Sequence, residues 1–213
     1  MKTDDLVSML AAGAAPVAPR AVERRYATAF GWGAFGSILL MALFLGVRPD
    51  LSEAARLPMF WAKLAFPALM IVAALYTVLR LSRPGVPAPH APALIAAPIA
   101  AMWLLAVLAL ASAEAGGRGA LIFGETWAEC PFNISLVALP SFLAAMWAMK
   151  GLAPTRVALA GGAAGLLAGS MGALAYALHC PEMAAPFLGI WYLLGMLIPA
   201  AVGALIGPLV LRW

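Results

Sequence analysis

Two cysteines, each followed by a proline, are the residues of this sequence best suited to chemistry. Cys130 follows Glu129, and Cys180 lies between His179 and Pro181-Glu182. Two thiols can form a disulfide, and thiolate together with imidazole suits soft metal ions such as zinc, cadmium or copper(I). The pattern therefore predicts either a disulfide, structural or redox-sensitive, or a soft-metal site. A single histidine such as His179 is more typical of a hydrogen-bonded loop residue than of a ligand.

The familiar signatures of catalysis and nucleotide binding do not occur in the sequence. It contains no phosphate-binding loop, no glycine-rich dinucleotide turn, no His-Glu-x-x-His and no Cys-x-x-Cys. The apolar segments carry no acidic residue of the kind that ion-coupled transporters place near the membrane midplane. The one lysine among them, Lys63, is expected near a segment end with its amine reaching outward. The sequence therefore predicts a protein that is not an enzyme and does not transport ions.

The elements that must position the cysteines are apolar segments of membrane-spanning length. Of the 213 residues, 65% are hydrophobic and only 10% are charged, which a soluble domain of this size cannot bury. The first segment is too long for a cleavable signal and is expected to be retained. The chain is thus predicted to be an all-α integral membrane protein, a bundle of six transmembrane helices. The expected helices are residues 27–47, 60–79, 91–113, 134–149, 157–178 and 187–211.

The distribution of basic residues predicts the orientation of this bundle. With both termini cytoplasmic, nine basic residues lie inside and three outside: Lys2, Arg20, Arg24, Arg25, Arg80, Arg83, Lys150, Arg156 and Arg212 against Arg48, Arg56 and Arg118. This topology places Cys130 and Cys180 on the outer face, where disulfides form and persist. Residues 1–25 form a cytoplasmic N-terminal segment, and residues 26–213 form the transmembrane domain.

The N-terminal segment contains a short predicted helix. Thr3, Asp4 and Asp5 are typical of a helix start, and an apolar face follows at Leu6, Val7, Met9 and Leu10. A linker rich in Ala, Pro and Gly separates this helix from the first span. The segment is either a flexible leader or a docking helix that offers Leu6, Met9 and Leu10 to a soluble partner.

Two further patterns predict how the outer loops are held. Small residues recur every fourth position in the fifth span and on one row of the sixth, which favours close packing of these helices: Gly161, Gly165, Gly169, Ala173 and Ala177 with Gly195, Gly203 and Gly207. The outer loop 114–133 contains the apolar residues Leu121, Ile122, Phe123 and Trp127, enough for a short interfacial helix that holds Cys130 near the membrane surface.

Several stretches also resemble a known family, the NrsF negative regulators of sigma F. The resemblance rests on the Met1–Leu6 start, Cys130-Pro131, Pro140, Ala153-Pro154, the glycine-rich fifth span ending in Tyr176-Ala177-Leu178-His179-Cys180-Pro181-Glu182, Trp191-Tyr192 and the Leu211-Arg212-Trp213 end. It covers essentially the whole chain, and the His-Cys-Pro-Glu element is its most specific part.

This resemblance implies an anti-sigma factor of the bacterial inner membrane, a multi-pass protein that binds an extracytoplasmic-function sigma factor and contacts no nucleic acid directly. It implies that heavy-metal or redox stress is sensed through Cys130 and Cys180, with His179, Glu182 and Glu129 tuning the thiols or completing a metal site. The docking residues would be Thr3, Asp4, Asp5, Leu6, Met9 and Leu10. No cofactor is expected, other than a soft-metal ion acting as the signal. The alternatives are a membrane thiol-disulfide/quinone oxidoreductase and a structural membrane protein with a static disulfide.

Overall fold

The apolar segments form a bundle of long helices. The computed structural model describes residues 3–12, 20–152 and 154–212, and every regular element in these ranges is helical. Within the described residues, five helical spans are long and apolar enough to cross a membrane. They are α2 (Ala21–Phe44), α4 (Pro58–Leu81), α5 (Ala91–Ser112), α9 (Val157–Tyr176) and a composite of α10 (Ala185–Phe187), a π-helical turn (Leu188–Tyr192) and α11 (Leu193–Val210).

The fourth expected span, residues 134–149, is broken in two, which was not predicted from the sequence. Its parts are α7 (Cys130–Val137) and α8 (Leu139–Lys150), which meet at an angle of 48°. Pro140 lies in the first turn of α8 and has no N–H to continue the hydrogen bonding of α7, and its ring would collide with the carbonyl of Leu136. The pair counts as a sixth span only if both parts cross the membrane together.

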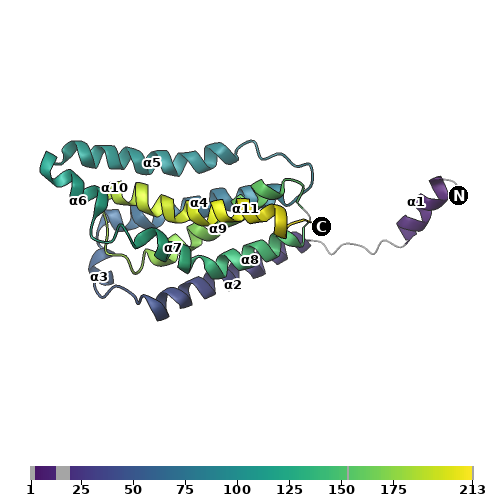
Figure 1. Ribbon diagram of the computed structural model, residues 1–213, viewed down its shortest axis with the longest axis horizontal. Helices are drawn as coiled ribbons and strands as arrows, with labels where there is room; N and C mark the ends of the chain where they lie inside the picture. Colours follow the sequence, from purple (N-terminus) through teal and green to yellow (C-terminus); the bar gives the residue numbers. More distant parts are fainter. Residues whose placement is uncertain (1–2, 13–19, 153, 213) are drawn as a thin grey trace.

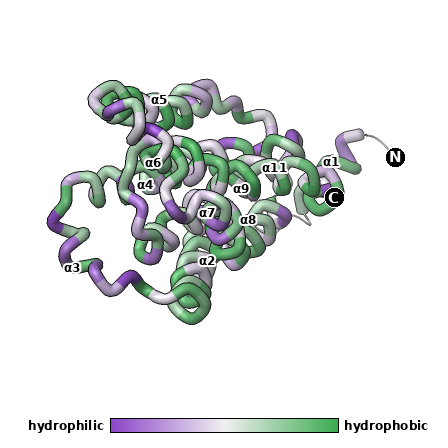
Figure 2. Tube along the Cα trace, turned by 60° about the vertical axis from the view of Figure 1, so that its left-hand side comes forward, coloured by the Kyte–Doolittle hydropathy of each residue, from purple (hydrophilic) through white to green (hydrophobic). Residues whose placement is uncertain are grey.

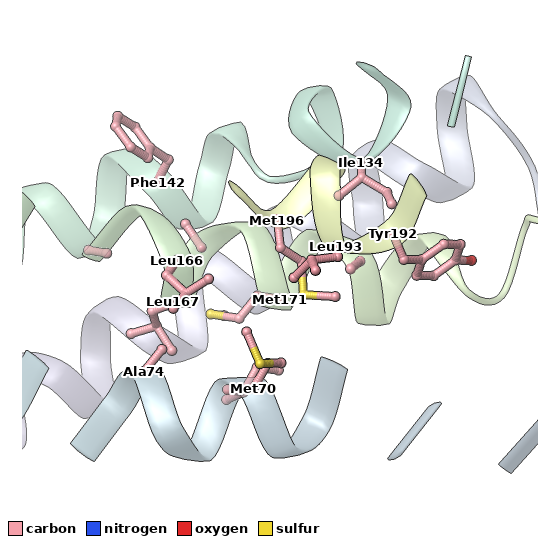
Figure 3. Close-up of a cluster of buried hydrophobic side chains, with 14 of the residues drawn as sticks. Met70, Ala74, Ile134, Phe142, Leu166, Leu167, Met171, Tyr192, Leu193 and Met196 are labelled. Atoms are coloured by element: carbon pink, nitrogen blue, oxygen red, sulfur yellow. The ribbon is translucent and has the colours of Figure 1, made fainter. Parts of the chain in front are cut away.

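Helix α9 is the centre of the bundle, and α2, α4, α7, α8 and α11 all pack against it. Figure 3 shows part of the resulting core, where Met171 of α9 meets Met70 of α4 and Met196 of α11. Helix α5 packs on α4 and α10 along the outside of the bundle (Figure 1). Hydrophobic residues predominate along the long helices (Figure 2). Many large apolar side chains are exposed, including Trp32, Leu43, Val107, Leu205 and Leu209. This exposed apolar surface is compatible with a lipid environment.

The predicted packing of small residues between the fifth and sixth spans is confirmed. A Cβ atom on Gly161 would overlap the carbonyl of Gly203, and one on Gly165 would overlap the carbonyl of Pro199. The backbones of α9 and α11 are therefore in direct contact, which only residues without a side chain permit. Gly195 differs from the expected row, because a Cβ there would meet Ile134 of α7 instead of α9.

Short elements gather at one end of the bundle. Figure 1 places α3 (Leu51–Ala54), α6 (Arg118–Phe123) and α10 at this end, and the C-terminus and the start of α2 at the opposite end. Helix α6 confirms the short helix predicted in the 114–133 loop. Trp191 fixes it to the bundle by donating a hydrogen bond to the carbonyl of Ile122 over 2.8 Å.

At the opposite end, an arginine joins the first and fourth spans. The Arg25 guanidinium donates hydrogen bonds to the carbonyls of Trp147 and Ala148 at the C-terminus of α8, and stacks 4.0 Å from the centre of the Trp147 ring. Helix α2 begins at Ala21, so the boundary expected between residues 25 and 26 falls within its first turns. The predicted N-terminal helix is present as α1 (Thr3–Ala12) and lies apart from the bundle in Figure 1. Most of the predicted linker, residues 13–19, lies outside the described residues.

Candidate functional site

The structure brings Cys130 and Cys180 together at the end of the bundle that carries α3, α6 and α10. Cys130 is the first residue of α7, and Cys180 lies in the connection that follows α9. Both are free thiols, both are fully buried, and the two side chains are in hydrogen-bonding contact. Residues 50 positions apart therefore form one site that could close into a disulfide or hold one ion between them.

The surroundings of Cys180 favour its ionised form. A hydrogen bond from the Cys130 thiol lowers the pKa of Cys180 to about 6; the positive charge of Lys63 acts in the same direction, and burial acts in the opposite one. The backbone N–H of Glu182 also donates to the sulfur. Cys180 is therefore the more acidic thiol of the pair, and a thiolate is the form that attacks oxidants and binds metals.

Lys63 is the residue whose position was predicted incorrectly. Its side chain does not reach outward to solvent but is fully buried in the second turn of α4. The amine donates hydrogen bonds to the backbone carbonyls of Cys180 and, over 2.9 Å, of Glu182. It also lies 5.5 Å from the centre of the Tyr192 ring. A lysine in an apolar helix is a recognised functional signal, so its isolation in the sequence was the indication that could have identified it.

Arg48 fixes the same connection from another side. Its guanidinium forms paired hydrogen bonds with both carboxylate oxygens of Asp50, at 2.7 and 2.6 Å, and donates to the Cys180 carbonyl over 3.2 Å. The hydrogen bond to Asp50 raises the pKa of Arg48, and the reciprocal interaction lowers the pKa of Asp50. The Arg48 backbone N–H donates to the carbonyl of Leu178. Nothing in the sequence around Arg48 indicated this role.

His179 and Glu182 form hydrogen bonds with neighbouring loops. A ring nitrogen of His179 lies 2.9 Å from the carbonyl oxygen of Gly46, in the loop after α2. The Glu182 carboxylate accepts hydrogen bonds from the backbone N–H groups of Glu125 and Thr126, at 2.8 and 3.3 Å. Thr126 in turn accepts a hydrogen bond from the N–H of Cys130, so Glu182 is linked to the start of α7.

Glu129 is the remaining candidate ligand that the sequence predicts beside the pair. Glu129 is exposed at the N-terminus of α7. Among the described residues, no group of three or more His, Cys, Asp or Glu side chains is arranged to hold a metal ion. Cys130 and Cys180 are the two side chains in contact here that suit a soft-metal ion.

Tyr192 closes the site from the π-helical turn and was not identified as a site residue from the sequence. Its side chain is fully buried, and its hydroxyl forms no hydrogen bond of good geometry with any described residue. The Tyr192 side chain interacts with the Cys180 sulfur. Figure 3 shows the hydroxyl pointing away from the apolar cluster formed by Met196 and Met171. A π-helical turn of this kind is frequent at functional sites.

The predicted docking residues lie on α1 and are all exposed. Leu6, Met9 and Leu10 have 41%, 59% and 68% of their surface accessible, and no described residue of α1 is buried. On a helix of 3.6 residues per turn these side chains share one face, and Ser8 lies on the opposite face. The helix therefore presents an apolar surface that the bundle does not cover.

Comparisons with known proteins find relatives that match this chain over its full length. A family model described as the negative regulator of sigma F matches residues 10–213. The chain is 53% identical over the full length of both proteins to one named "probable anti-sigma-F factor NrsF" from Azospira oryzae. It is 38% identical, again over the full length of both, to the "anti-sigma-F factor NrsF" of Caulobacter vibrioides. No solved structure matches.

Proposed function

Because this chain belongs to the NrsF family of negative regulators of sigma F, we propose that it is a membrane-bound anti-sigma factor that sequesters an extracytoplasmic-function sigma factor. The observation that carries this proposal is the identity to two proteins with that name over their full length. In the same proposal, the protein is a multi-pass protein of the bacterial inner membrane with both termini in the cytoplasm. The apolar helices and the basic residues near the expected inner ends support this placement.

The sigma factor is proposed to dock on the cytoplasmic face, chiefly on α1. The support is the exposed row of Leu6, Met9 and Leu10, which has no partner of its own in the bundle. Thr3, Asp4 and Asp5 begin this helix and add a charged edge to the same surface. The loops at 80–83 and 150–156 carry basic residues on the same predicted side and would add contacts.

The signal is proposed to be oxidation of the Cys130–Cys180 pair, with capture of a soft-metal ion as the alternative. The support is the contact between two buried thiols at the predicted periplasmic end of the bundle, one of them favoured as a thiolate. Each sulfur belongs to a different part of the fold, α7 or the α9–α10 connection. A bond between them would shift how these parts pack, and such coupling between distant sites is typically worth about 1–3 kcal/mol.

The same cysteines would serve a thiol-disulfide/quinone oxidoreductase, which is the competing function. Such an enzyme must present its nucleophile to a protein or quinone substrate, yet both cysteines are fully buried. Small oxidants and metal ions need far less access than those substrates. The burial therefore favours a sensor over a catalyst.

The test of sequestration is a matched pair of substitutions on α1. Leu6→Asp places a charge on the apolar face, and Ser8→Asp places the same charge on the opposite face. We expect Leu6→Asp to release the sigma factor and raise sigma-dependent transcription without stress, and Ser8→Asp to leave both unchanged. Equal retention of the sigma factor by both variants, at equal protein levels, would refute docking through this face. Turnover of thiols with quinone reduction by the purified protein would favour the oxidoreductase.

A further inference from the structure

The hydrogen bonds of the buried Lys63 amine do not balance its positive charge. The amine donates its hydrogen bonds to neutral backbone carbonyls, those of Cys180 and Glu182. No salt bridge to Lys63 occurs among the described residues. Burying an ammonium group is costly unless an opposite charge lies close by.

The Cys180 sulfur is the group that can supply this charge. It is fully buried, belongs to the residue whose carbonyl Lys63 binds, and interacts electrostatically with the Lys63 amine. The Cys130 thiol and the backbone N–H of Glu182 donate hydrogen bonds to the same sulfur, and the Tyr192 hydroxyl lies near it. A sulfur surrounded by a cation and hydrogen-bond donors is in a setting that stabilises a thiolate.

We propose that Lys63 is the counter-charge that makes Cys180 the attacking sulfur of the pair, with Cys130 as the resolving thiol. The assignment gives the two cysteines different chemical roles and makes Cys180 a site of sulfenic acid formation. It rests on the proposed redox role of the pair but not on sigma binding. Lys63 acts here as a positioning residue, because it sets the charge state of Cys180 and does not react itself.

The reaction balances with hydrogen peroxide as the two-electron oxidant. The Cys180 thiolate attacks one peroxide oxygen, the O–O bond breaks, and hydroxide leaves, which gives the sulfenic acid at Cys180. The Cys130 sulfur then attacks the Cys180 sulfur, the S–O bond breaks, and the hydroxide leaves as water with the Cys130 proton. Two electrons pass from the two sulfurs to the peroxide. The product disulfide carries no charge, so the Lys63 amine loses its counter-ion.

The test measures sulfenic acid at Cys180 in the full chain purified in detergent micelles, without a sigma factor. Cys130→Ser removes the resolving thiol but keeps a hydrogen-bond donor, and dimedone traps the sulfenic acid for mass spectrometry. At pH 7, adding Lys63→Met should slow labelling about tenfold, the effect of raising the thiol pKa from about 6 to about 8. Lys63→Arg retains the charge and should retain most of the rate. Arg212→Met is the control, since it removes an exposed cation near the C-terminus at the opposite end of the bundle (Figure 1), and it should leave the labelling rate unchanged.

A second comparison keeps the proposal testable even if Lys63→Met does not fold. With Lys63 intact, the protein with Cys180 alone should react about tenfold or more faster than the protein with Cys130 alone, made by Cys180→Ser. Equal rates with and without the Lys63 charge, or equal reactivity of the two single-cysteine proteins, would overturn the assignment. Because the readout is chemical, normal labelling together with failed sigma retention would contradict only the proposed function.

Discussion

The Lys63 amine donates a hydrogen bond to the carbonyl oxygen of Cys180, 117 residues further along the chain. The same oxygen accepts a hydrogen bond from Arg48, so α4 and the loop after α2 both hold the connection between α9 and α10 at a single atom. The side chain of Cys180 is thereby fixed against Cys130 at the start of α7. A chemical change at this sulfur therefore acts where several spans of the bundle meet.

Stability of the reduced protein should depend on pH between about 6 and 9. The pKa of Cys180 is lowered from 9.0 to about 6 in the folded state, chiefly by the Cys130 hydrogen bond and with help from Lys63. An acid with a depressed folded pKa stabilises the fold fully above its unfolded pKa, and this contribution is lost as the pH falls through the folded pKa. We expect the Tm under reducing conditions to fall as the pH is lowered from 9 through about 6. The Cys180→Ser protein should lack this slope, and an identical slope in both proteins would contradict the ionisation of Cys180.

The Arg48–Asp50 pair should add a second pH dependence at lower pH. The hydrogen bond from Arg48 lowers the pKa of Asp50 below 3.8, so the stabilisation is present above that value and is lost as the pH falls beneath it. We expect Asp50→Asn to lower the Tm at pH 7. It should also remove the decrease in Tm that we expect for the unmodified protein below pH 3.8. Thermal melting in detergent across this range measures both. If Asp50→Asn matches the unmodified protein at every pH, the pair does not stabilise the loop.

The position of the Glu182 carboxylate should depend on Gly124, which the sequence alone did not single out. Gly124 has φ 55° and ψ −157°, a conformation that only glycine adopts readily, and a Cβ there would strike the Glu182 carboxylate. We expect Gly124→Ala to destabilise the fold by about 1–3 kcal/mol. Gly119→Ala is the control, because that glycine lies in α6 with open space around it. Equal Tm values for the two variants would show that Glu182 does not require this turn.

The contact between α9 and α11 should be the least tolerant of added volume. A Cβ at Gly165 would overlap backbone atoms of Pro199 and Ala200, which cannot move aside as a side chain can. We expect Gly165→Ala to cost about 1–3 kcal/mol through overpacking. Gly31→Ala, in an exposed part of α2 with nothing nearby, should be neutral or stabilising by about 0.5–1 kcal/mol. Unfolding in detergent compares the two, and a stable Gly165→Ala protein would mean that the helices can separate without loss.

Most of the architecture was predictable because it depends on local patterns. Runs of about 20 apolar residues predict the long helices, and the four-residue spacing of Gly161 and Gly165 predicts their close packing. The break at Pro140 was missed because hydropathy alone does not register a lost N–H. That proline was visible in the sequence, and its position within a short span was the available signal.

The candidate site was predictable only in its cysteines. Two Cys-Pro pairs on the same predicted face indicated Cys130 and Cys180, but the roles of their neighbours depend on three-dimensional contacts. His179 and Glu182 were predicted to tune the thiols or bind a metal, and that role stays a prediction. The hydrogen bonds that they form, with Gly46 and Thr126, depend on loops distant in sequence. Lys63 was assigned to the surface because a charge at a helix end usually reaches water. Which carbonyl such a side chain meets cannot be read from hydropathy.

The measurement that most directly tests the central claim is retention of the sigma factor before and after oxidation. The full-length protein is purified in detergent under reducing conditions together with the sigma factor that it retains, then treated with hydrogen peroxide. We predict that the sigma factor is bound before treatment and released after it, and that the Cys180→Ser protein retains it throughout. Release that proceeds equally from the Cys180→Ser protein, or retention that oxidation does not alter in the unmodified protein, would contradict an anti-sigma factor switched by this pair.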